Sequence, residues 1–154
     1  MKILLTIDDS HSAAAPIREA ATRPWPEGTV VRVMTVLEPI SSAAYIPEAP
    51  MVPLTSPLEL QVQQDEALGM VASVGRMLSP QGLIVETVVR QGATGRTIVE
   101  EAAEWGADLI LIGSHGRTGL RRVLMGSVAQ YVTAHARCSV EVVRSGPGEE
   151  EHAP

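Results

Sequence analysis

Apolar residues follow two kinds of pattern along the chain, and the two patterns alternate. Short apolar runs of strand length lie at residues 2–7, 29–37, 83–89, 107–113 and 139–143. Between them, apolar positions recur at helical spacing in four segments, at 13–22, 58–78, within 92–106 after a glycine turn, and at about 127–136. Strands that alternate with helices predict an α/β protein in which a parallel sheet carries helices on both faces.

Capping and breaking residues mark where these helices begin and end. We expect Ser10 or Ser12 to cap the first helix, with Pro16 confined to its first turn. The segment 79–82, Ser-Pro-Gln-Gly, ends the long helix, and Gly106 is expected to close the helix that follows. These signals support the helix boundaries that the apolar pattern predicts.

Length and composition limit the chain to one domain. It has 154 residues, of which 45% are hydrophobic, enough to bury a single core. We expect this domain to occupy residues 1–145. It includes a proline-rich stretch at 38–57 that predicts a loop, either a functional lid or a disordered insertion. Residues 146–154 are polar, acidic and rich in helix breakers, which predicts a disordered tail.

Charge and cysteine content exclude several classes of function. The net charge is −6, and three of the negative charges lie together at 149–151, so binding to nucleic acid or to an anionic membrane is not expected. No apolar stretch reaches the roughly 18–20 residues of a membrane span, and the first residues lack the features of a signal peptide. We therefore expect a cytoplasmic protein. Cys138 is the single cysteine, which excludes an internal disulfide and a multi-thiolate zinc site.

Candidate chemistry follows the strands, because ligands of open parallel sheets bind at the carboxyl ends of the strands. Three segments lie there: 8–10 (Asp-Asp-Ser), 92–95 (Gly-Ala-Thr-Gly), and the residues from Gly113 onward. Gly113, Gly116 and Gly119 follow the most hydrophobic strand, where bare backbone N–H groups are able to approach an anion. Their spacing, GxxGxxG, is neither that of the P-loop nor the GxGxxG of dinucleotide-binding turns.

A second glycine position, Gly126-Ser127, needs its own explanation. Glycine inside a helix costs about 1 kcal/mol relative to alanine, so these residues are expected to begin a helix. Ser127 would then cap that helix and offer N–H groups, a hydroxyl and the positive end of the helix dipole to an anion. Two such half-sites suit a polyphosphate. The alternative is that Gly113 and Gly116 form only a tight turn, and Gly126 only a close helix contact.

The pattern Gly113-x-x-Gly116, nine residues, then Gly126-Ser127 resembles the ATP-binding pattern of the universal stress protein family. KILLTIDDS resembles the first strand and acidic turn of that family, GSHGRTGLRRVLMGSVAQYV its signature segment, and CSVEVVR its closing strand. The resemblance covers residues 1–145. It implies a Rossmann-like fold, with an open five-stranded parallel sheet in the strand order 3-2-1-4-5 and a nucleotide across the strand ends.

The resemblance also assigns roles to individual residues. Asp8 would lie beside the adenosine, and the backbone of Val36 would contact adenine. Gly113 and Gly116 would hold the ribose and phosphates, and Gly126 with Ser127 the phosphate tail, where Mg²⁺ would bridge the phosphates with help from Ser127. From the residues alone, Arg117 is left undecided between pairing with phosphate and facing solvent.

Two departures from the family pattern concern the third strand and the last strand. Thr94 follows Gly92-Ala93 where the family often has proline, and the last strand begins Cys138-Ser139 in place of Cys-Pro. Relatives often form homodimers through this last strand, which here carries Glu141. We expect a homodimer through this strand.

These observations lead to three hypotheses for the function. The first is a cytoplasmic universal stress protein in which ATP is a regulatory ligand for unknown protein partners, with at most slow hydrolysis. The second is a nucleotide-independent interaction module of the same fold. The third, weaker hypothesis is an ATP-consuming enzyme of the adenylating or pyrophosphatase type. Such enzymes typically need an SGGxDS-like loop after the first strand, and this chain has DDSHS there.

Overall fold

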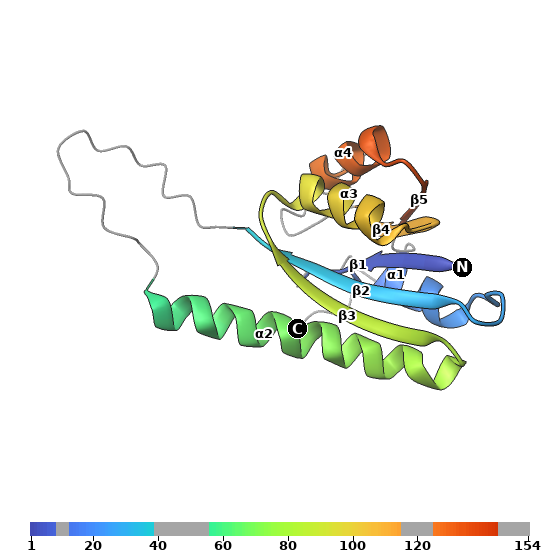
Figure 1. Ribbon diagram of the computed structural model, residues 1–154, viewed down its shortest axis with the longest axis horizontal. Helices are drawn as coiled ribbons and strands as arrows, with labels where there is room; N and C mark the ends of the chain where they lie inside the picture. The colour runs from blue at the N-terminus through green and yellow to red at the C-terminus, as the bar shows by residue number, and fades with distance from the viewer. Residues whose placement is uncertain (9–12, 39–55, 115–124, 145–154) are drawn as a thin grey trace.

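Parallel strands form one sheet in the order β3-β2-β1-β4-β5, which confirms the predicted strand order (Figure 1). This computed structural model describes residues 1–8, 13–38, 56–114 and 125–144. Within them lie the strands β1 (Lys2–Thr6), β2 (Val30–Leu37), β3 (Ile84–Gln91), β4 (Leu109–Gly113) and β5 (Ser139–Val143). Each strand overlaps an apolar run that the sequence pattern predicts.

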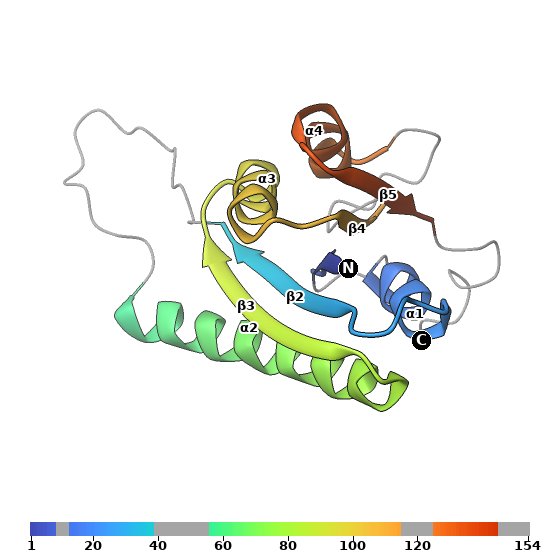
Figure 2. The same cartoon turned by 45° about the vertical axis from the view of Figure 1, so that its right-hand side comes forward.

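Helices cover both faces of the sheet, as predicted (Figures 1 and 2). The helices are α1 (Ala14–Thr22), α2 (Pro57–Leu78), α3 (Thr94–Trp105) and α4 (Ser127–His135), and a 3₁₀ turn, η2 (Ser79–Gln81), follows α2. The first two helices pack on one face, and α3 and α4 pack on the other. No helix in the described ranges is long and apolar enough to cross a membrane.

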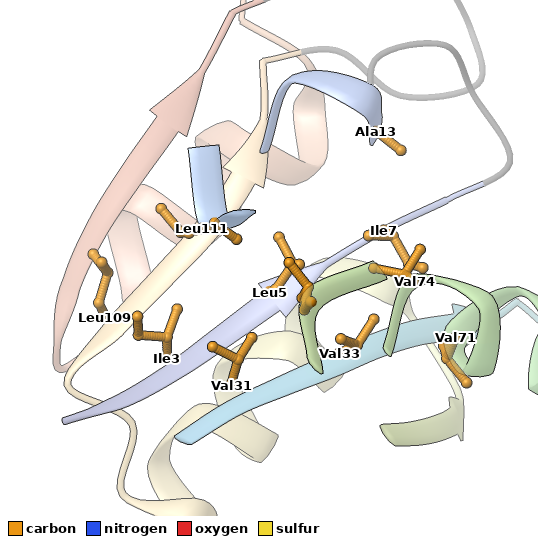
Figure 3. Packing of buried hydrophobic residues seen from close by; sticks show 12 residues of the cluster. Ile3, Leu5, Ile7, Ala13, Val31, Val33, Val71, Val74, Leu109 and Leu111 are labelled. Carbon is orange, nitrogen blue, oxygen red and sulfur yellow. The ribbon is translucent and has the colours of Figure 1, made fainter. Parts of the chain in front are cut away.

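The core has two layers because successive strand residues point to opposite faces. On the face toward α1 and α2, Leu5, Val33 and Leu111 are fully buried and pack in one cluster with Val71 and Val74 (Figure 3). The other face buries a second set against α3 and α4, made of Leu4, Met34, Ile110, Ile98, Ala102 and Val132. The central strands are therefore apolar at consecutive positions, which is the pattern typical of a parallel sheet.

The helix ends agree with most of the predicted signals. Gly106 ends α3 in the left-handed conformation, with φ of 72°, and Pro16 lies in the first turn of α1. The N-cap of α1 is Ala13, which makes no side-chain capping bond; Ser10 and Ser12 lie outside the described residues. Residues 39–55 and 145–154, with nearly all of the predicted loop and tail, also lie outside them.

The N-terminal half of α2 extends past the carboxyl ends of β2 and β3 (Figures 1 and 2). Its first turn is stabilised by a capping box, in which Ser56 and Glu59 each bond the backbone of the other. The buried face of the helix begins only at Ala67, and Leu58 is 73% exposed. The residues of α2 before Ala67 are therefore mostly exposed, apolar side chains included.

Candidate functional site

The carboxyl ends of β1, β2 and β4 bring three of the predicted site residues to one edge of the sheet. Thr6 aligns with Met34, and the Ile7 N–H donates to the Met34 carbonyl at 2.9 Å, so Asp8 comes level with Val36. On the other side β1 pairs with β4, which ends at Gly113. The chain winds outward from β1 through β2 on one side and through β4 on the other, so this edge is the switch point where α/β sheets bind ligands.

Ser114 connects β4, β5 and the start of α4. Its N–H donates to the Val143 carbonyl at 2.9 Å, and its own carbonyl accepts the Gly126 N–H at 2.8 Å. The residue is only 5% exposed. These bonds hold Gly126 beside the end of β4, so the two glycine positions of the sequence motif meet in space. The sequence analysis did not single out Ser114, although a polar residue directly after a buried strand was a visible signal.

Gly126, and not Ser127, is the N-cap of α4, which corrects the prediction that Ser127 caps this helix. The Gly126 carbonyl accepts the Gln130 N–H at 2.9 Å, and Ser127 is the first helical residue. The Gly126 N–H is bonded to the Ser114 carbonyl, and its φ is −58°. The cap makes no side-chain bond, so the first-turn N–H groups, including that of Ser127, have no carbonyl partner within the helix.

The N-terminus of α3 lies at the same edge, and a carboxylate of the chain already occupies it. Glu38, just past the end of β2, accepts the Thr94 hydroxyl at 2.6 Å and the Thr94 N–H at 3.3 Å. A negative side chain at a helix N-terminus is favourable for the same reason that a bound anion is. Within the described residues, α4 is therefore the one of these two helices whose N-terminus has no carboxylate bonded to its first residue.

The glycines at 92 and 95 are explained by packing. Gly92 has φ of +148°, and a Cβ placed on it would lie 2.6 Å from the Thr97 Oγ1. A Cβ on Gly95 would lie 2.9 Å from the Tyr131 ring, at the contact between α3 and α4. Both positions thus require the smallest residue for reasons unrelated to a ligand.

The remaining predicted residues divide between exposed positions and undescribed ones. Asp8, Val36 and Gly113 are half-buried, and Ser127 is exposed. Gly116 and Arg117 lie outside the described residues. Within the described ranges, no group of three or more His, Cys, Asp or Glu side chains is arranged to hold a metal ion. The described part of the site is therefore made of backbone groups, one carboxylate and one hydroxyl.

Cys138 directly precedes β5, so it lies at the amino ends of the strands, opposite the candidate site. Its side chain packs against the apolar cluster under α3 and α4. Burial raises the pKa of its thiol, because the thiolate would lose hydration there. A reactive cysteine needs the opposite shift. In such a position a thiol behaves as a small hydrophobic side chain.

Topology and switch-point geometry together define a Rossmann-like α/β protein in which the glycine-capped N-terminus of α4 lies at the carboxyl ends of the strands. A model of the universal stress protein family matches residues 1–144. The chain belongs to the universal stress protein family.

Individual relatives agree with this assignment. Universal stress protein Sll1388 of Synechocystis is 39% identical over 85 residues, which are 55% of this chain and 55% of that protein, so the match spans about half the length of the relative. YxiE of Bacillus subtilis is 26% identical over 150 residues, covering 93% of this chain and 98% of the relative.

Solved structures show the same fold. MJ0577 of Methanocaldococcus jannaschii superposes with a TM-score of 0.77 at 24% identity, covering 96% of this chain and 97% of that one. An Arabidopsis thaliana family member with AMP bound gives 0.65 at 14% identity, covering 95% and 92%. An Archaeoglobus fulgidus protein in complex with dAMP gives 0.54 at 21% identity, covering 93% and 97%.

Proposed function

We propose that the chain binds an adenine nucleotide, ATP in the first place, across the carboxyl ends of β1, β2 and β4. The observation that carries this proposal is the open N-terminus of α4, which Ser114 holds against the end of β4 at the switch point. A helix N-terminus with free N–H groups favours phosphate. Family members with AMP or dAMP bound support adenine as the base.

The proposed contacts follow the strand ends. Asp8 lies beside the adenosine and the backbone of Val36 contacts adenine, since the two residues are level at the edge. The backbone of Gly113 faces the ribose and phosphates, and the first turn of α4 binds the phosphate tail. Gly116 and Arg117 belong to the same proposal, outside the described residues. Mg²⁺ would bridge phosphate oxygens and the exposed Ser127 hydroxyl.

We propose that the nucleotide is a regulatory ligand in a stress response of the cytoplasm, and that hydrolysis is at most slow. Fast phosphoryl transfer needs carboxylates that hold Mg²⁺ and a cation on the transferred phosphate. The proposed set contains a single carboxylate, Asp8, and it is assigned to the adenosine end. A ligand that binds one state of the protein more tightly shifts the population toward that state, without any chemical step.

One observation favours the interaction-module hypothesis as a second candidate. The N-terminal half of α2 exposes Leu58, Leu60 and Val62 by 73%, 48% and 47%, and Leu58 and Val62 lie one turn apart on the same side of the helix. Recruitment of a protein partner through this helix is compatible with nucleotide control.

A homodimer through β5 also stays a prediction. On that strand the Glu141 carboxylate is bonded to the Arg23 guanidinium at 2.8 and 2.5 Å.

The test is mass spectrometry of any ligand released when freshly purified protein is denatured, followed by calorimetric titration of the stripped protein with ATP and Mg²⁺. Gly126→Leu is the informative variant. Its φ of −58° suits any residue, so the change fills the space at the α4 N-terminus without backbone strain. We expect at least a tenfold loss of affinity.

Gly69→Leu is the matched control, because a Cβ at Gly69 on α2 would have no atom within 4 Å. It should bind ATP like the wild type. Absence of binding at millimolar ATP in the wild-type protein would refute the nucleotide proposal and leave the interaction module as the better explanation. Equal affinity of the Gly126→Leu variant would show that nucleotide, if bound, does not use the α4 N-terminus.

A further inference from the structure

β3 is an edge strand whose outer backbone groups are available for pairing. Within the described strands it pairs only with β2. The N–H groups of Ile84 and Gly92 donate to carbonyls on the β2 side, at 3.1 and 3.0 Å, so residues with even numbers face β2. In a regular strand the alternate residues, Val85, Thr87, Val89 and Gln91, then direct their N–H and C=O groups away from the sheet.

Natural edge strands usually carry features that prevent pairing, such as proline, lysine or a bulge. The β3 sequence, IVETVVRQ, has no proline and no lysine, and its register with β2 runs without a break from Ile84 to Gln91. Ile84 is also 55% exposed. A strand of this length and composition is a template for a further strand.

The charges on β3 are self-complementary. Glu86 and Arg90 lie on the same face of the strand, and their side chains are 44% and 47% exposed. Each is held in place from its own subunit, Glu86 by Arg32 at 2.5 Å and Arg90 by the buried Glu101 at 2.7 Å. The two opposite charges therefore stand at fixed positions on either side of Val88.

We propose that β3 pairs antiparallel with β3 of a second copy of this chain, with Val88 opposite Val88 of the partner subunit. In this register Glu86 faces Arg90 of the partner subunit, and Arg90 faces Glu86 of the partner subunit. The outward backbone groups also meet, because Thr87 is opposite Val89 of the partner subunit. Opposite-charge cross-strand pairs stabilise such a ladder.

Other symmetric registers lack this match. A slip of two residues sets either Glu86 or Arg90, depending on its direction, against Val88 of the partner subunit and so removes both charge pairs. A slip of four residues places either Glu86 or Arg90 directly opposite its own copy, and like charges in this position are destabilising. Charge therefore selects one register, which is what a specific two-fold interface requires.

β5, the outer strand on the other side of the sheet, is less suited to the same pairing. β5 is shorter, spanning Ser139–Val143, and it carries one charged residue, Glu141, at its centre. β5 holds no positive charge to pair with Glu141 across a two-fold axis, and the Glu141 carboxylate is already bonded to Arg23 in its own subunit. Antiparallel pairing points the carboxyl ends of the two sheets in opposite directions, so the two proposed nucleotide sites would lie away from the β3 contact. The β3 proposal therefore does not rest on nucleotide binding.

Matched edge prolines test which strand pairs. Thr87→Pro removes an N–H that points away from β2, so the ladder inside the subunit keeps its bonds. Val142→Pro does the same on β5, where Val143 and the other odd-numbered residues face β4. Because a homodimer through β5 is also predicted, the β3 contact is measured with β5 blocked. Val142→Pro should still associate in sedimentation equilibrium, and the Thr87→Pro/Val142→Pro double variant should associate at least tenfold more weakly. Monomeric Val142→Pro, or equal association of the double variant, would overturn the proposal.

A cysteine pair gives a second test that does not require a proline variant to fold. Val88→Cys in a Cys138→Ala background should form an intermolecular disulfide under mild oxidation, because the two copies meet at the two-fold axis. Ile84→Cys in the same background is the matched control, since the register separates the two copies of this residue by roughly 26 Å. Failure of Val88→Cys to link, or equal linking of both variants, would refute the register.

Discussion

Gly92→Ala is the substitution for which the structure gives the most specific expectation. Gly92 follows β3, and its N–H donates to the Leu37 carbonyl at 3.0 Å, so the turn into α3 is tied to the end of β2. Its φ is +148°, which side chains of L-amino acids rarely adopt, and an added Cβ would lie 2.6 Å from the Thr97 Oγ1. Backbone strain and steric overlap therefore act together at this position.

The expected cost can be divided between these two causes. A residue forced into such a backbone conformation costs about 1–3 kcal/mol. Overlap with a neighbour that is fixed by its own bond costs a further ~1–3 kcal/mol. Thr97 is fixed in this way, because its hydroxyl donates to the Ala93 carbonyl at 3.0 Å. We expect Gly92→Ala to lower the free energy of unfolding by about 3 kcal/mol, or roughly 6–12 °C in Tm for a chain of this size.

Urea unfolding followed by circular dichroism measures this cost in a double-mutant cycle. In a Thr97→Ala background the overlap is gone, so the same Gly92→Ala change should cost only the backbone term, about 1–3 kcal/mol. Gly69→Ala, on the exposed side of α2 with open space around it, should be neutral or stabilising. A cost below about 1 kcal/mol for Gly92→Ala, or additivity of the two changes, would refute the reasoning.

Three further predictions concern charge, reactivity and capping. Glu101→Gln should destabilise the fold by about 1–3 kcal/mol in urea unfolding, because Arg32 and Arg90 lose their shared carboxylate; a value near zero would contradict it. That carboxylate is 4% exposed, whereas the arginines remain 20% and 47% exposed, so the cost is below that of a fully buried pair. Cys138 has a raised thiol pKa, so below pH 9 it should react with a disulfide reagent several-fold more slowly in the native protein than in urea. The protonated form is favoured by folding, so this contribution to stability is present at neutral pH and is lost as the pH rises through the native pKa. Ser56→Ala should lower the free energy of local opening of the first turn of α2 by about 1 kcal/mol. Hydrogen exchange there should therefore become faster, without a matching drop in Tm.

Much of the fold was predictable because local signals and packing agree. The run 107–113 is apolar on consecutive positions, and β4 there is buried on both faces. The helix closed by Gly106 ends where that glycine adopts a left-handed conformation. The capping box at Ser56 and Glu59 was also visible as S-x-x-E ahead of the long helix, although the prediction placed the helix start one residue late. The strand order came from the family resemblance, since periodicity alone does not order parallel strands.

The candidate site was less predictable because long-range hydrogen bonds build it. Sequence spacing suggested that Gly113 and Gly126 act together, but the bond between Gly126 and Ser114 that joins them is a tertiary contact. The preference of serine for N-cap positions favoured Ser127, whereas the chain path gives that position to Gly126. The bond from Thr94 to Glu38, between residues far apart in sequence, has no local signal either.

The two helix N-termini at the carboxyl edge differ in a way that bears on where the proposed nucleotide would place its phosphates. Both α3 and α4 begin there, and each presents the positive end of a helix dipole. At α3 the chain supplies its own anion, Glu38, which bonds Thr94 through both the hydroxyl and the N–H. At α4 the cap is a glycine without a side chain, and its N–H is used to fix the helix against β4. A phosphate at α3 would have to displace this carboxylate, whereas at α4 the cap residue makes no side-chain bond. The same sheet edge thus discriminates between two similar helix ends by the residue that precedes each of them.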